Sequence, residues 1–109
     1  MANMNPIIHQ SVRLRIMAAL TAVDANEQVE FTYILALLKL THGNLGAHLH
    51  KLENAGYIAM EKTFVDRKPR TYIAVTAFGQ HAFAEHIATL AMILEGGESF
   101  TDAEKNELP

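Results

Sequence analysis

The hydrophobic period of this chain changes at Tyr57, and no other feature constrains its fold as strongly. Before Tyr57, apolar residues recur every three to four positions, which is the period of an amphipathic helix. After it, large aliphatic side chains occupy every second position over residues 58–61 and again over residues 72–75, which is the period of a half-buried strand. The sequence therefore predicts helices first and an antiparallel pair of strands after them.

Polar residues that favour the N-cap of a helix precede each periodic apolar run, and they are Asn5, Thr32, Thr41 and Thr76. The helices that they predict extend as far as Val23, Leu38, Gly56 and Gly96. The second of these helices is only about two turns long. The polar segment 24–28 is expected to form a turn between the first two helices.

The segment between the two expected strands concentrates positive charge, because residues 62–71 contain four basic residues and one acid, Asp66. The basic residues are Lys62, Arg67, Lys68 and Arg70. Asp66 favours a turn, and Pro69 has no N–H to donate to a strand ladder. We therefore expect strand pairing to stop before the tip, so that the hairpin projects a long polar loop.

Charge is distributed unevenly over the 109 residues, whose net charge is −3. Residues 1–94 contain eight Lys or Arg and seven Asp or Glu, whereas residues 95–109 contain one and five. The last segment also lacks a periodic apolar face. We expect residues 1–94 to form one folded domain that includes N-terminal and C-terminal dimerisation helices, and residues 95–109 to be a flexible acidic tail.

Several classes of protein are disfavoured by composition. The chain contains no cysteine, which excludes disulfides, thiolate zinc sites and cysteine nucleophiles, and fits a cytoplasmic location. No apolar run approaches the roughly 18 residues that span a bilayer, so no membrane partner is expected. The sequence has neither a zinc-protease HExxH motif nor a glycine-rich phosphate loop. Neither enzymatic activity nor a cofactor is predicted.

Three helices followed by a hairpin is the element order of a winged helix-turn-helix, and two sequence segments resemble one family of that fold. The run THGNLGAHLHKLENAGYI resembles the recognition helix and following strand of small MarR/ArsR-like winged-helix regulators. The run EKTFVDRKPRTYIAVTAFG is similar to their wing and to the start of their last helix. The likeness covers most of residues 7–94, although Gly46 and Ala47 replace the serine or longer polar side chains that are common there.

The resemblance implies a mainly α fold with a β-hairpin (α+β), in which an additional C-terminal helix mediates dimerisation. It also implies a homodimeric cytoplasmic regulator of transcription without catalytic activity. Sequence-specific binding to double-stranded DNA, as a repressor that occludes a promoter, is the predicted function. Two alternatives stay open, a protein-interaction module that does not bind DNA and a regulator that responds to a small-molecule effector or a metal.

A recognition helix needs one apolar face that holds it to the domain and polar residues near its N-terminus that reach the major groove. Leu45, Leu49 and Leu52 supply the apolar face. The candidate DNA contacts are Thr41, His42, Asn44, Ala47, His48 and Lys51 in the helix, and Lys62, Arg67, Lys68, Arg70 and Thr71 in the wing. The simpler alternative is a solvated helix face beside a solvated loop tip.

The last helix carries apolar residues at spacings of four, three and four, which is the pattern of a coiled-coil contact. The expected dimerisation residues are Ile8, Val12, Phe83, Ile87, Leu90 and Leu94. Arg13 and Arg15 flank the apolar stripe of the first helix and are expected to be ion-pair partners at the surface or at an interface rather than DNA contacts. His81 and Glu85 lie one turn apart and His86 on another side, but solvated histidines explain them more simply than a metal site does.

Overall fold

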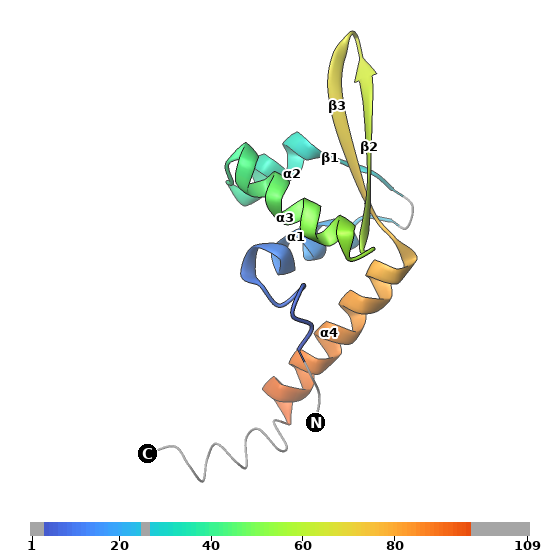
Figure 1. Ribbon diagram of the computed structural model, residues 1–109. Helices are drawn as coiled ribbons and strands as arrows, with labels where there is room; N and C mark the ends of the chain where they lie inside the picture. The colour runs from blue at the N-terminus through green and yellow to red at the C-terminus, as the bar shows by residue number, and fades with distance from the viewer. Residues whose placement is uncertain (1–3, 25–26, 97–109) are drawn as a thin grey trace.

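The computed structural model describes residues 4–24 and 27–96, so most of the expected acidic tail lies outside the described residues (Figure 1). The elements in chain order are α1 (Ser11–Thr21), β1 (Val29–Glu30), α2 (Phe31–Leu38), α3 (His42–Asn54), β2 (Ile58–Val65), β3 (Lys68–Val75) and α4 (Ala77–Glu95). They form a winged helix fold, in which three helices precede the β2–β3 hairpin and a fourth follows it. The predicted α+β class is confirmed.

The core lies where α1, α2 and α3 meet the base of the sheet. Its fully buried large side chains are Ile8, Ile16, Met17, Leu20, Ile34, Leu45, Leu49, Leu52 and Ile73. All three leucines of the predicted α3 stripe are among them, which confirms the apolar face of that helix. Packing of this face against the rest of the core orients α3 and leaves its opposite face outward.

Two of the four predicted N-caps are confirmed. The Thr41 hydroxyl oxygen accepts from the backbone N–H of Asn44 at 3.1 Å, and that of Thr76 accepts from Gly79 at 2.9 Å. The predicted end of α3 is also confirmed, because Gly56 has a φ of 85°.

The other two predicted helix starts are wrong. The Asn5 side chain accepts from the backbone N–H groups of Ile7 and Ile8 and caps a separate turn, whereas α1 starts at Ser11 with Gln10 as its N-cap. In the second case, α2 starts at Phe31, one residue before Thr32, because it follows directly on the paired strand β1.

The sheet contains three antiparallel strands in the order β1-β3-β2. Strand β1 pairs Val29 with Ile73 and Glu30 with Tyr72. Two residues are too few to produce an alternating pattern, so the sequence did not predict this strand. Its pairing ties the entry of α2 to the base of the hairpin.

The predicted long polar loop at the hairpin tip is wrong. The β2–β3 ladder continues to the pair Val65 and Lys68, and only Asp66 and Arg67 remain in the turn. Pro69 is accommodated opposite Phe64. In an antiparallel ladder, hydrogen-bonded pairs alternate with pairs that exchange no hydrogen bonds. The pair Val65 and Lys68 that closes the turn is of the first kind, so Phe64 and Pro69 form a pair of the second kind. The Pro69 nitrogen therefore points away from β2, at a position that the short strand β1 does not reach.

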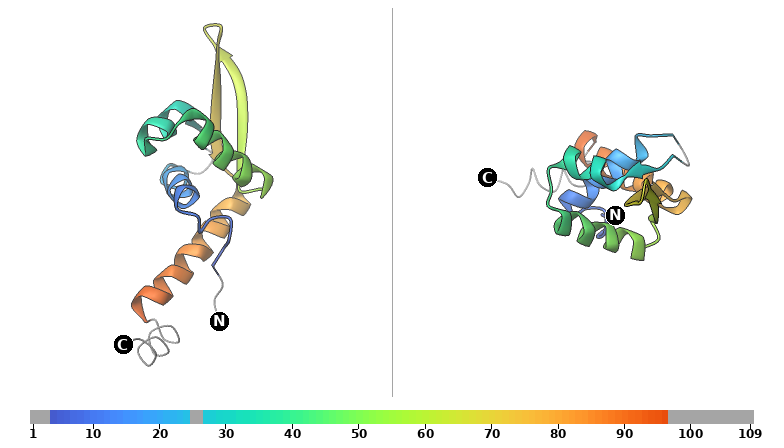
Figure 2. Two further views of the ribbon diagram at one scale, coloured as in Figure 1. Left: turned by 60° about the vertical axis from the view of Figure 1, so that its left-hand side comes forward. Right: turned by 90° about the horizontal axis from the view of Figure 1, so that it is seen from above.

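Helix α4 leaves the domain on the side away from the hairpin tip (Figures 1 and 2). At its start, a Cβ on Gly79 would lie 2.0 Å from the Tyr57 carbonyl oxygen, so only glycine allows this close approach to the residue before β2. Within the described segments, no helix is long and apolar enough to cross a membrane.

Candidate nucleic-acid interface

Helix α3 lies beside the base of the hairpin, which projects past α2 and α3 (Figures 1 and 2). Opposite the buried leucines, the exposed residues of α3 include Gly43, Asn44, Ala47, His50, Lys51 and Asn54. Three of the predicted candidates, Asn44, Ala47 and Lys51, therefore lie on this outward face. An asparagine amide can pair with adenine, and a lysine ammonium can neutralise a phosphate.

His50 also lies on the outward face of α3, although it is not among the predicted contacts. Helical spacing in the sequence could have predicted this position, because Gly43, Ala47, His50 and Asn54 follow one another at intervals of four, three and four residues. These positions form a second helical stripe opposite the leucines. A neutral or charged imidazole there can donate a hydrogen bond outward.

Among the residues that the structure describes, none packs against the two glycines of α3. A Cβ placed on Gly43 or on Gly46 would meet no heavy atom within 4 Å. A glycine inside a helix costs about 1 kcal/mol relative to alanine. Since intrachain packing does not explain that cost, the glycines instead leave the backbone of α3 open to close approach from outside.

His48 does not lie on the outward face, contrary to the prediction from helical spacing. It is half-buried, and its Nδ1 accepts from Nη1 of Arg13 at 3.1 Å. Burial lowers the pKa of His48 below its ordinary value, and the charges of Arg13 and Lys51 lower this pKa further. The neutral imidazole joins α3 to α1 and so positions α3, while Asn44 and Lys51 face outward.

Arg13 is buried rather than placed at the surface as an ion-pair partner. Only 9% of it is exposed, and its Nε donates to the Ile7 carbonyl oxygen at 2.6 Å. The Ile7 carbonyl oxygen and His48 Nδ1 both accept hydrogen bonds from the buried Arg13 guanidinium, and these bonds offset the cost of burying its charge. Arg15 approaches the carbonyl oxygen of Leu38 at 3.5 Å.

The wing presents three exposed cations, Lys62, Arg67 and Lys68. Arg70, predicted with them, is half-buried and forms an ion pair with Glu30 at the junction of β1 and α2. The charge of Arg70 is thus already partnered, and the residue anchors the hairpin. Thr71 is half-buried and lies across the ladder from Lys62.

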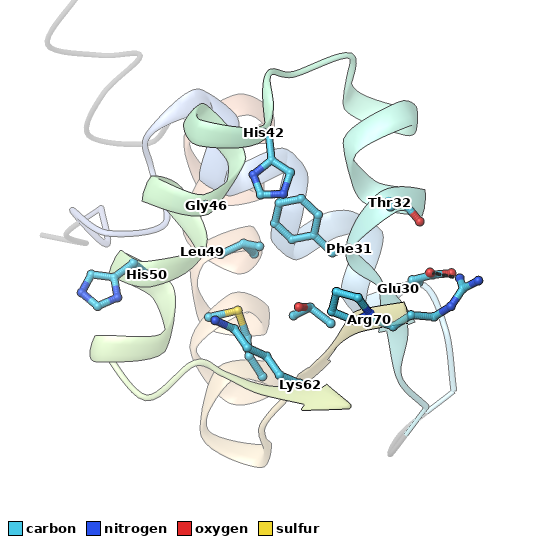
Figure 3. Close-up of a pocket in the computed structure, with 12 residues that line it drawn as sticks. Glu30, Phe31, Thr32, His42, Gly46, Leu49, His50, Lys62 and Arg70 are labelled. Carbon is cyan, nitrogen blue, oxygen red and sulfur yellow. Dashed lines mark hydrogen bonds and ion pairs between the residues drawn. The ribbon is translucent and has the colours of Figure 1, made fainter. Parts of the chain in front are cut away.

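A hollow of about 400 Å³ separates α3 from the hairpin (Figure 3). His42 closes it at the start of α3, where its ring packs against that of Phe31 at a tilt of 42°, with centroids 4.6 Å apart. Leu49 forms part of its floor and Lys62 part of its hairpin side (Figure 3). His42, Lys62 and Thr71, three of the predicted DNA contacts, line this hollow together.

The apolar seam expected on α4 is partly open. Ile87 is 41% and Leu94 80% exposed, while Phe83 and Leu90 are half-buried. Val12 is half-buried as well. Ile8, however, is completely buried within one chain, so its assignment to a dimer surface is wrong.

The histidines of α4 lie in two different environments. His81 Nε2 is 3.4 Å from an oxygen of Glu85, and both side chains are about 70% exposed. His86 is buried, its Nδ1 accepts from the Asn5 N–H at 3.4 Å, and its ring lies edge-on to that of His9. Among the residues that the structure describes, no three metal-ligating side chains come together.

Comparisons with known proteins point to one family. The sequence model of the winged helix DNA-binding domain family matches residues 12–94. An uncharacterized protein of Methanocaldococcus jannaschii is 37% identical over 81 residues, which cover 74% of this chain and 85% of that protein.

Solved structures agree with the family match. A transcriptional regulator homologue from Pyrococcus horikoshii is 33% identical, with a TM-score of 0.75 over 84% of this chain and 88% of the other. A PadR-like transcription factor from Bacteroides fragilis has the same fold, at 23% identity and a TM-score of 0.61 over 77% of this chain and 84% of the other. The narrower resemblance to MarR/ArsR-like regulators is not distinguished from such neighbours.

Proposed function

Because the chain belongs to the winged helix DNA-binding domain family, we propose that it regulates transcription by binding double-stranded DNA. In this proposal, α3 enters the major groove and the hairpin lies over the neighbouring backbone and minor groove. One observation carries it: the outward face of α3 lies beside a wing with three exposed cations, and no described atom packs against Gly43 or Gly46 of that helix. The relative from Pyrococcus horikoshii, described as a transcriptional regulator homologue, supports this function.

The two elements are proposed to do different work. Lys62, Arg67 and Lys68 contact phosphates, which supply affinity with little dependence on sequence. The outward face of α3 reads base edges, with Asn44 as the principal candidate because its amide can pair with adenine. Thr41 and His42, at the start of α3, lie where contacts position the helix in the groove.

We further propose that the active form is a homodimer that represses by occluding a promoter. The exposed apolar side chains of Ile87 and Leu94 support a contact between two copies of α4, because an open apolar stripe is costly in water. Two recognition helices related by a two-fold axis favour half-sites about 34–36 Å apart, or a multiple of that distance.

The test is selection of bound duplexes from a random pool by the full chain, followed by affinity measurements at several salt concentrations. We expect one preferred operator with two-fold symmetry. Replacing Arg67 and Lys68 by alanine should weaken binding to all duplexes and reduce the salt slope by about 0.9 for each phosphate that the variant no longer neutralises. Binding that shows neither sequence preference nor salt dependence would contradict the proposal.

Asn44→Ala separates base reading from phosphate contact. It should cost roughly 1–3 kcal/mol on the selected operator, and much less on random duplex, because only a base contact discriminates among sequences. Asn54→Ala, at the C-terminal end of α3 and away from the N-terminal residues that reach the bases, is the matched control. An equal loss on both kinds of duplex would assign Asn44 to the backbone instead.

A further inference from the structure

The wing exposes a large aromatic side chain close to its tip. Phe64 is 73% exposed and pairs across the ladder with Pro69, which is exposed as well. Side chains alternate along a strand, so Phe64 shares a face with Met60 and Lys62, both of which line the hollow beside α3. The aromatic ring therefore belongs to the side of the hairpin that carries Lys62, one of the proposed DNA contacts.

The surroundings of Phe64 distinguish it from an ordinary exposed apolar residue. Single exposed apolar side chains are common, but here a phenylalanine and a proline form a joint apolar surface on a projecting hairpin. Arg67 lies beside this surface in the turn and Lys62 lies on the same face nearer α3, whereas Lys68 shares the opposite face with Val65. Apolar surface bordered by cations is complementary to a base stack bordered by phosphates.

We propose that Phe64, backed by Pro69, is a wedge that enters the minor groove of duplex DNA and partly unstacks one base step. This inference rests on the proposed function and adds a deformation of the DNA to it. Phenylalanine and proline are among the residues that minor-groove proteins insert between base steps. Arg67 and Lys62, the cations beside Phe64, would meet the phosphates that border the groove.

The shape of the hairpin fits this role. Its turn consists of Asp66 and Arg67 alone, so the tip is no wider than the two-stranded ladder. The axes of paired strands lie about 4.8 Å apart, and the atoms of both strands make the ribbon wider than the roughly 6 Å minor groove of undistorted B-DNA. The tip of the hairpin can therefore bring Phe64 to the base edges only where the minor groove widens. Partial unstacking of one base step widens the groove.

Two consequences follow for the operator. The step that faces Phe64 should be a flexible pyrimidine–purine step, such as TA or CA, because these steps unstack most easily. The bound duplex should also be bent by roughly 20–90° at that step.

The experiment measures bending and unstacking on the selected operator. Energy transfer between dyes at the two ends reports the bend, and a fluorescent adenine analogue at the wing-facing step reports unstacking. The wild-type chain should bend the duplex and raise the fluorescence of the analogue. Phe64→Ala should abolish both signals and weaken operator binding, while the salt slope stays unchanged because no charge is removed.

Matched variants isolate the wedge from the rest of the hairpin. Phe64→Leu keeps an apolar wedge and should retain both signals. Val65→Ala lies on the opposite face of the same strand and should also retain them. Because Phe64 is largely exposed, thermal midpoints of the variants should match the wild type.

Three results would overturn the wedge. If Phe64→Ala bends and unstacks the operator as the wild type does, DNA binding stands and the wedge does not. If Phe64→Ala changes only the association of bound copies with one another, the aromatic surface contacts a second chain. If the wild-type chain shows no salt-dependent duplex binding, the proposed function fails together with the wedge.

Discussion

Arg13 Nη1 donates to His48 Nδ1 across 3.1 Å, and this contact joins α1 to α3. A guanidinium has no acceptor, so His48 must present an unprotonated Nδ1 to keep the contact. Protonation would place two donors and two positive charges against each other. The position of α3 is therefore coupled to the charge of one half-buried imidazole.

The first prediction is a loss of stability in mild acid. The folded-state pKa of His48 is lowered from 6.5, so the unfolded chain binds the proton more readily. Stability is then fully present above pH 6.5 and falls as the pH drops from 6.5 toward the lowered pKa of the folded state. Burial and the nearby His9 lower the pKa of His86 too, and its effect has the same sign.

The measurement is the thermal midpoint of the wild type and of His48→Gln between pH 8 and pH 5. Glutamine keeps an oxygen that can accept from Arg13 but does not titrate. We expect a smaller decrease with pH in the variant, whereas the contribution of His86 remains in both proteins. An identical pH dependence would show that His48 does not couple protonation to folding.

The second prediction concerns the hairpin turn, where Asp66 and Arg67 have φ values of 53° and 67°. Positive φ at both central residues is what a type I′ turn requires, and glycine meets it without strain at the second position. Arg67→Gly should stabilise the fold by about 1 kcal/mol and yet weaken DNA binding, because it removes a cation. Chemical denaturation and duplex titration measure the two effects, and Arg67→Ala, which keeps the strain, is the control.

The third prediction concerns assembly. Replacing Ile87 and Leu94 together by glutamate should give a folded monomer, because both side chains are well exposed within one chain. Sedimentation measures the oligomeric state, and circular dichroism shows whether the variant folds. Met92→Glu, which is also exposed on α4 but outside the seam, is the control and should stay dimeric. A stable dimer of the double variant would place the interface elsewhere.

The fourth prediction uses the unpacked glycines of α3. Gly46→Ala should raise stability by up to about 1 kcal/mol, because the helix gains propensity and the added Cβ meets no described atom within 4 Å. Duplex affinity should fall if the α3 backbone approaches DNA closely, and we expect this fall for Gly43→Ala as well. Unchanged affinity in both variants would mean that the glycines serve neither packing nor DNA contact.

The sequence alone determined the order of the four helices and the hairpin, and the buried face of α3. The spacing of Leu45, Leu49 and Leu52 contains this information, because a helix with one apolar stripe must turn it to the core. The caps at Thr41 and Thr76 and the helix end at Gly56 were also predictable, because they are local features. Each depends on a hydrogen bond or a backbone angle within a few residues.

Contacts between distant segments were decided only by the tertiary structure. His48 and Arg13 are separated by 35 residues, as Arg70 and Glu30 are by 40, and no local pattern reports such pairs. Strand β1 exists because β3 offers it an edge, and the hairpin extends to its tip because Pro69 falls at a position that needs no donor. Side chains assigned to DNA or to a dimer by spacing were thus reassigned once the fold supplied their partners.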